Sequence, residues 1–154
     1  MKRLLTLYLN TFDGLSREVW WLALITLINR AGTMVIPFLS LYLTEDLGFS
    51  PSTVGSIMAA FGLGSVVGSW LGGKLTDKIG YYRIMVFSLF VSGLLFIYLQ
   101  YLKTVLSLSI GIFVLMLVAD MFRPAMFVAL SAYSKPENKT RSVTLIRLAI
   151  NLGF

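Results

Sequence analysis

Residues 84–102 read IMVFSLFVSGLLFIYLQYL, a stretch of 19 positions without one charged side chain. About 20 apolar residues are enough for a helix to cross the hydrocarbon core of a bilayer. A membrane β-strand would need only about 9–11 residues and would alternate apolar with polar side chains. Because backbone groups in lipid must bond within their own segment, this stretch predicts a transmembrane helix.

Further apolar runs lie on both sides of this one. They cover residues 19–43, 53–73 and 105–132, and a fifth run starts near residue 142 and is still apolar at Phe154. We therefore expect an all-α, polytopic membrane helix bundle with four complete transmembrane helices and the start of a fifth. Residues 1–18 carry no signal-peptide cleavage pattern, and we expect them to form a cytoplasmic lead-in.

The composition favours the same class of protein and argues against others. Hydrophobic residues make up 57% of the chain and charged residues 13%, against about 25% charged residues in ordinary soluble domains. The chain has no cysteine and no histidine, which removes disulfides, Cys/His metal sites and the commonest catalytic bases. No glycine loop of the phosphate-binding type is present. We expect no enzyme activity, no metal and no cofactor.

The basic residues predict the orientation in the membrane. With a cytoplasmic N-terminus, nine Lys or Arg side chains outside the apolar runs face the cytoplasm, and one, Lys103, faces outward. The nine are Lys2, Arg3, Arg17, Lys74, Lys78, Arg83, Lys135, Lys139 and Arg141. Cytoplasmic loops carry such an excess of positive charge, so we expect this orientation in a bacterial inner membrane. The net charge of +6 therefore does not indicate a nucleic-acid partner.

A motif follows the second apolar run, where residues 72–83 read GGKLTDKIGYYR. It resembles the loop signature of the major facilitator superfamily, which runs Gly-x-x-x-Asp-(Arg/Lys)-x-Gly and continues with basic residues. The matching positions are Gly73, Asp77, Lys78 and Gly80. In the family this loop joins the second and third helices on the cytoplasmic side, and the basic residues predict the same place for it here.

The resemblance implies that this loop acts as a conformational latch, in which the aspartate helps to hold two halves of a transporter together. Tyr81 and Tyr82 stand where the family usually has a basic residue, and Arg83 follows them as a displaced substitute. We expect residues 74–83 to form this loop, and we count Arg83 with the four matching positions as the latch residues.

Small residues recur at every fourth position of the second run. They are Ser56, Ala60, Gly64, Gly68 and Gly72. Residues spaced by four form one slowly drifting stripe on a helix, and glycines allow another helix to approach closely. We expect Gly64, Gly68 and Gly72 to form a helix-packing seam, which is either static packing between neighbours or a sliding seam between two halves of a transporter.

Four polar side chains fall inside the predicted helices: Asn29, Arg30, Asp120 and Arg123. A charge at bilayer depth costs roughly 2.5–3.5 kcal/mol, so it is kept where it faces a cavity or a partner. Arg30 lies 11 residues after position 19, and Asp120 lies ten before position 130 on an oppositely directed helix. At 1.5 Å per residue, both lie about 15–16 Å above the cytoplasmic face.

Since the first and fourth helices of the family line the central cavity, we expect Arg30 and Asp120 to share an ion pair or a charged cavity wall. Arg123 lies on the same helix face as Asp120. We interpret Asn29, Arg30, Asp120 and Arg123 as candidates for substrate binding or proton coupling. The alternative is a buried pair that only fixes helix packing, and Asn29 could equally bond across helices without a role in transport. Pro37 and Pro124 should bend the first and fourth helices.

The resemblance implies a secondary active transporter of a small solute, working by alternating access and coupled to protons. Residues 19–154 would be part of its first six-helix half. Its partners would be the solute, protons, the lipid bilayer and a missing C-terminal half, and the apolar run cut at Phe154 suggests a fragment. The alternative is a complete small membrane protein, a multidrug pump or scaffold acting as an oligomer. The sequence does not indicate the solute.

Overall fold

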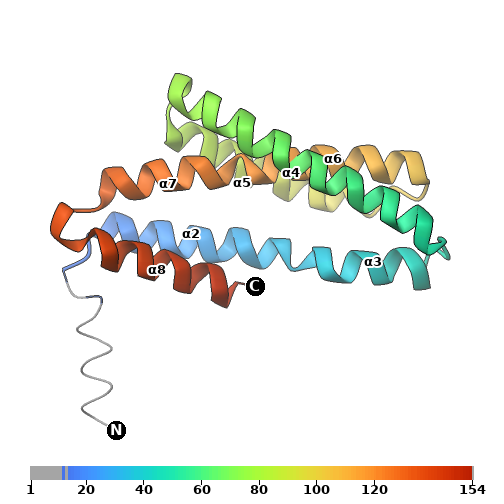
Figure 1. Ribbon diagram of the computed structural model, residues 1–154, viewed down its shortest axis with the longest axis horizontal. Coiled ribbons are helices and arrows are strands. Elements are labelled where there is room, and N and C mark those ends of the chain that lie inside the picture. The colour runs from blue at the N-terminus through green and yellow to red at the C-terminus, as the bar shows by residue number, and fades with distance from the viewer. Residues whose placement is uncertain (1–11, 13, 154) are drawn as a thin grey trace, which may run out of the picture. The chain divides into compact units, whose positions relative to one another are not determined.

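The computed structural model describes residue 12 and residues 14–153, so most of the predicted lead-in lies outside the described residues. The described part is built from helices and turns and has no strand, which confirms the all-α prediction (Figure 1). The elements are α2 (Arg17–Thr33), α3 (Val35–Glu45), α4 (Pro51–Ile79), α5 (Tyr81–Leu99), α6 (Val105–Asp120), α7 (Phe122–Tyr133), the 3₁₀ turn η1 (Pro136–Asn138) and α8 (Lys139–Leu152).

These helices give four spans of membrane-crossing length and composition among the described residues, as predicted. They are Arg17–Glu45, Pro51–Ile79, Tyr81–Leu99 and Val105–Tyr133. Three of them have 29 residues, or about 43 Å at 1.5 Å per residue. The fifth predicted segment is α8, which starts at Lys139 rather than near residue 142 and has 14 residues. Large apolar side chains such as Leu63, Phe90 and Leu106 are exposed along the spans, as lipid contact requires.

The first and fourth spans are each interrupted by one residue, Met34 and Met121. Each interruption falls three residues before a proline, Pro37 and Pro124. A proline inside a helix lacks the amide that would bond four residues back, and its ring crowds that carbonyl. The expected disturbance of these two helices therefore takes the form of a joint between two shorter helices in each span.

The segment 74–83, predicted as a loop, is almost wholly helical. α4 continues to Ile79 and α5 starts at Tyr81, so that Gly80 alone joins them. The prediction was wrong because hydropathy detects where apolar residues end, whereas Lys74, Asp77 and their neighbours continue the helix without a proline or glycine to stop it. Gly80 has a φ of +88°, which favours glycine.

The described residues form two compact units. The first unit contains residues up to Met34 and those from Phe127 onward. Within it α2 and α8 lie side by side and run parallel (Figure 1). At one end the Asn138 side chain donates a hydrogen bond to the carbonyl of Gly14, with an N–O distance of 2.8 Å. At the other end Gly153 packs against the backbone of α2.

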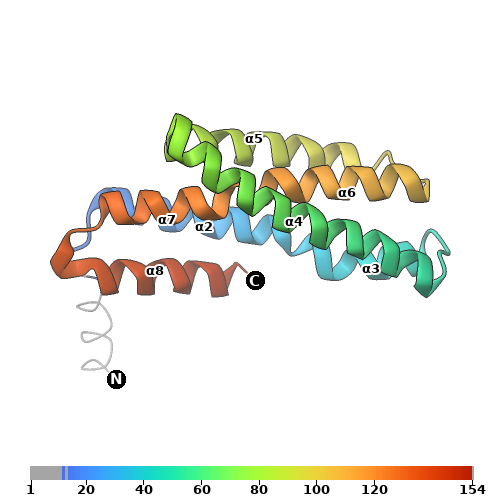
Figure 2. The same ribbon diagram turned by 45° about the horizontal axis from the view of Figure 1, so that its top comes forward.

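The second unit covers Val35–Met126. In it α4 packs against α6, and α5 and α3 pack beside these two helices (Figure 2). The apolar core of the unit joins α3, α4 and α6. It consists of Leu39, Leu43, Val54, Ile57, Leu108, Ile112 and Met116.

Candidate functional site

The three seam glycines of α4 lie directly against the backbone of α6 in the second unit. In chain order, Gly64 faces Phe113, Gly68 faces Leu117 and Gly72 faces Met121. A Cβ atom on Gly64 or Gly68 would collide with the carbonyl oxygen opposite, and one on Gly72 would lie 2.6 Å from the Cα of Met121. From one contact to the next, the residue number rises by four on both helices, so α4 and α6 run parallel. Because α6 already covers this face, the contacts favour static packing over a sliding seam.

Next to this seam, the carboxyl group of Asp120 is buried, with 6% of the residue exposed. The hydroxyl of Ser65 on α4 donates a hydrogen bond to its Oδ2 atom. Nη2 of Arg123 lies 3.8 Å from its Oδ1 atom. Both carboxylate oxygens therefore have a partner, one from a neighbouring helix and one from the next turn of the chain. The predicted grouping of Asp120 with Arg123 is found, whereas Ser65 was not predicted.

The backbone around Asp120 is also supported by side chains. Asp120 is the last residue of α6, and Pro124 has no amide to bond its carbonyl. The buried hydroxyl of Ser88 on α5 donates to the carbonyl of Val118, at 2.7 Å, and contacts that of Ala119, at 3.3 Å. Ser88 of α5 thus bonds to carbonyl groups in the last turn of α6. The Asp120 carboxyl group therefore extends from a backbone that α5 fixes in place.

The other two candidates, Asn29 and Arg30, are partly buried on α2 in the first unit. A Cβ on Gly153 would lie 2.6 Å from the Cβ of Arg30 and 2.9 Å from the carbonyl oxygen of Leu27. The end of α8 therefore meets α2 at the turn that carries Arg30, and only glycine fits there. Arg30 and Asp120 belong to different units, so their pairing stays a prediction.

The predicted latch residues lie on both sides of the α4–α5 turn, with Gly73, Asp77 and Lys78 in α4, Gly80 at the turn and Arg83 in α5. Asp77, Lys78 and Arg83 are exposed, and a Cβ on Gly73 would meet open space among the described residues. Close by, Nζ of Lys74 lies 4.0 Å from the centre of the exposed Trp70 ring. A cation over an aromatic ring of this kind suits the interface between membrane and water. The latch role itself stays a prediction.

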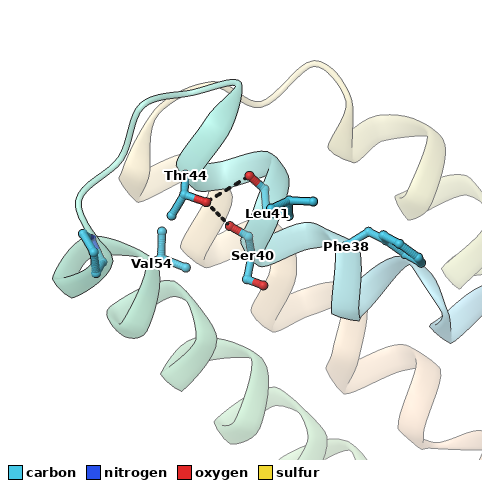
Figure 3. Close-up of a pocket in the computed structure, with 6 residues that line it drawn as sticks. Phe38, Ser40, Leu41, Thr44 and Val54 are labelled. Carbon is cyan, nitrogen blue, oxygen red and sulfur yellow. Dashed lines mark hydrogen bonds between the residues drawn. The ribbon is translucent and has the colours of Figure 1, made fainter.

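Each unit also contains an apolar groove whose lining includes no charged residue. The second unit has a groove of about 490 Å³ between α3 and the start of α4. Its lining residues are Phe38, Ser40, Leu41 and Thr44 of α3 and Pro51 and Val54 of α4. Figure 3 shows that the Thr44 hydroxyl is turned onto the backbone, where it donates to the carbonyls of Ser40 and Leu41 at 3.0 Å. In the first unit, α2 and α8 enclose a groove of about 260 Å³ with side chains such as Trp20 and Leu145.

The partners that sequence reasoning missed are small residues. Ser65 and Ser88 bond to the end of α6, and Gly153 abuts α2. A serine next to a glycine of the period-four stripe was a usable signal, because a short hydroxyl side chain can reach a second helix where glycines bring the backbones together. The stripe of small residues on α4 did not indicate that α6 is the helix that packs against it.

Comparison with known proteins places the chain in a family. The sequence model described as Major Facilitator Superfamily matches residues 22–154. This range includes every described helix except the first turn of α2. No solved structure matches the chain.

Several curated proteins are similar to the chain over most of its length. The uncharacterized MFS-type transporter YqjV of Bacillus subtilis (strain 168) is 30% identical over 140 residues, 87% of this chain and 33% of that protein. The 4-hydroxybenzoate transporter PcaK of Pseudomonas aeruginosa is 28% identical over 85% of this chain and 29% of that protein. The multidrug resistance protein MdtH of Aeromonas hydrophila is 26% identical over 87% and 34%. The chain spans about a third of the length of these relatives.

Proposed function

The chain belongs to the Major Facilitator Superfamily, and on that premise we propose that it forms most of the first half of a proton-coupled secondary transporter for a small solute. It is an integral membrane protein of a transporter family. In this family two halves pack around a site near the middle of the bilayer and expose it alternately to either side. The proposal of a second half takes its support from the relatives, of which the chain covers about a third.

The single observation that carries the proposal is the buried Asp120. An ionisable residue inside a membrane span is expensive and marks an ion or substrate pathway by default. Asp120 is bonded by Ser65 and lies beside Arg123, at a joint where the fourth span is interrupted. Its carboxyl group can gain and lose a proton, which is the chemical requirement for coupling solute movement to a proton gradient.

Arg30 supplies the opposite charge in this proposal. It lies 13 residues after Arg17 (30 − 17), and Asp120 lies 13 residues before Tyr133 (133 − 120). The start of α2 is tied to the end of α7, because the Ser16 hydroxyl donates to the carbonyl of Tyr133 at 3.1 Å. Counted from this tie, Arg30 is 14 residues along its span and Asp120 is 13 along its own, which supports nearly equal depths in the membrane. We assign Arg30 to the same cavity as Asp120, where it would attract anionic groups of the solute.

We further assign the N-terminus, the α4–α5 turn and the segment between α7 and α8 to the cytoplasmic side of a bacterial inner membrane. The support is the distribution of Lys and Arg between the spans. On this side Asp77, Lys78, Gly80 and Arg83 would form the latch against the second half. Because a single residue joins α4 to α5, a displacement of Asp77 would move the end of α4 and the start of α5 together.

The test is transport by the full-length protein in proteoliposomes with an imposed pH gradient. Two probes are used: 4-hydroxybenzoate, after which one relative is named, and a lipophilic cationic dye as a test drug. We expect gradient-dependent movement of a probe, and its loss in Asp120→Asn at unchanged protein content. Transport that ignores the pH gradient would remove proton coupling from the proposal. Transport by residues 1–154 alone would instead support a complete small oligomeric protein.

A further inference from the structure

We propose that Ser65 of α4 is a positioning residue for Asp120, and that the glycine seam brings its hydroxyl within reach. The inference rests on the proposed function, because it matters for transport only if Asp120 takes part in transport. Among the described residues of the second unit, the hydrogen bond from Ser65 is the one that joins the Asp120 side chain to a neighbouring helix. The assignment starts from this contact and from the spacing of the residues around it.

The seam explains how so short a side chain can cross between two helices. Helix axes in proteins are usually 8–10 Å apart, with side chains filling the space. At Gly64 and Gly68, which lie one residue before and three residues after Ser65, the backbone of α6 leaves no room even for a Cβ. The same close approach lets the Ser65 hydroxyl meet the carboxylate of Asp120. A methyl group added to the seam would push α6 away and separate the two.

The chemistry of the two partners of Asp120 differs, and the difference assigns a role to each. A hydroxyl donates to an ionised carboxylate and accepts from a protonated one, so Ser65 can keep its bond in both states. Arg123 attracts only the ionised form, and its side chain is 48% exposed, where solvent screens the attraction. Ser65 therefore fixes the direction of the carboxyl group through a cycle of proton binding and release, and Arg123 does not.

A merely structural hydrogen bond predicts different behaviour. Bonds between membrane helices contribute modestly to stability whether or not their partner is functional. Loss of such a bond would lower the amount of folded protein by a similar factor in any background. A positioning bond instead loses its importance once the carboxyl group that it directs is gone.

The experiment measures gradient-driven uptake by the full-length protein, using whichever of the two probes named above it transports. Four variants are compared: Ser65→Ala, Ser65→Thr, Asp120→Asn and the double variant Ser65→Ala/Asp120→Asn. We expect Ser65→Ala to lower uptake by about 10- to 150-fold, the range that a lost hydrogen bond to a charged group gives. Ser65→Thr keeps the hydroxyl and should retain most of the uptake. In downhill exchange of the probe without a pH gradient, adding Ser65→Ala to Asp120→Asn should cause no further loss.

Ser69→Ala is the matched control, since Ser69 lies one turn further along α4 and is also partly buried. It should transport normally, and the melting temperature of each variant in detergent separates folding from transport. Normal uptake in Ser65→Ala beside an inactive Asp120→Asn would overturn the role of Ser65 alone. Full additivity of the two changes would do the same. Normal gradient-driven uptake in Asp120→Asn would overturn the role of Asp120, and the inference with it.

Discussion

Gly72 of α4 packs against Met121, the residue that separates α6 from α7 in the fourth span. The last glycine of the seam therefore contacts the interruption of that span. A Cβ on Gly72 would be 2.6 Å from the Cα of Met121 and 3.0 Å from the Cγ of Pro124. The interruption that proline causes is thus held against a neighbouring helix. Because the joint is packed in this way, Asp120 projects from a defined position.

Gly68→Ala should destabilise the second unit. The added methyl group would collide with the carbonyl of Leu117, and backbone cannot move aside as the end of a side chain can. Overpacking of this kind costs typically about 1–3 kcal/mol. Thermal unfolding of the full-length protein in detergent should show a lower midpoint.

Gly62→Ala provides the matched control for the seam. Gly62 lies in the same helix, but a Cβ there meets open space among the described residues. Since alanine favours a helix over glycine by about 1 kcal/mol in water, this change should leave the midpoint unchanged or raise it. An equal loss of stability in both variants would contradict the seam packing.

Gly80→Ala should be harmful for a reason unrelated to any latch. Gly80 has a φ of +88° and a ψ of 150°, a backbone conformation that is nearly restricted to glycine and costs a residue with a Cβ about 1–3 kcal/mol. We expect a lower unfolding midpoint for Gly80→Ala and little change for Gly73→Ala, where a Cβ meets open space. Equal midpoints for the two variants would show that the α4–α5 turn does not require glycine.

Asp77→Asn tests the latch role in transport separately from the structural role of the α4–α5 turn. Asp77 is exposed at the end of α4, so neutralising it should leave the unfolding midpoint unchanged. If Asp77 holds two halves of the transporter together, uptake by the full-length protein should fall while its folding stays intact. Normal uptake in Asp77→Asn would reduce this residue to a solvated surface charge.

The sequence predicted the spans better than their contacts. Hydropathy identified four spans, and Pro37 and Pro124 indicated where two of them are disturbed, because both signals act within a single helix. The end of α4 was misplaced by six residues, since the membrane boundary near residue 73 is not the end of the helix at Ile79. Ser65 was missed as a partner of Asp120 because the stripe on α4 does not reveal that α6 approaches it.

The predicted orientation can be tested by cysteine labelling, because the chain has no cysteine of its own. Lys78 and Asp46 are both exposed and lie near opposite ends of α4. In intact cells, a membrane-impermeant maleimide should label Asp46→Cys and should label Lys78→Cys only after the membrane is opened. The reverse pattern would place the N-terminus outside and would move the latch to the other side of the membrane.

The pairing of Arg30 with Asp120 gives the last prediction. Removing one partner of a buried ion pair leaves an uncompensated charge, whereas removing both can be nearly neutral. We therefore expect Arg30→Gln and Asp120→Asn each to lower the unfolding midpoint of the full-length protein, and the double variant to recover part of the loss. Arg123→Gln is the comparison, because Arg123 lies 3.8 Å from Asp120 but is 48% exposed.

The comparison with Arg123 decides between two arrangements of charge. If Arg30 is the partner that balances Asp120, the recovery should appear with Arg30→Gln and be weak with Arg123→Gln, since solvent screens an exposed charge. If Arg123 alone balances the carboxylate, the effects of Arg30→Gln and Asp120→Asn should simply add, as they do for independent sites. Additive effects would separate Arg30 from Asp120 and leave Ser65 and Arg123 as the groups that hold the acid.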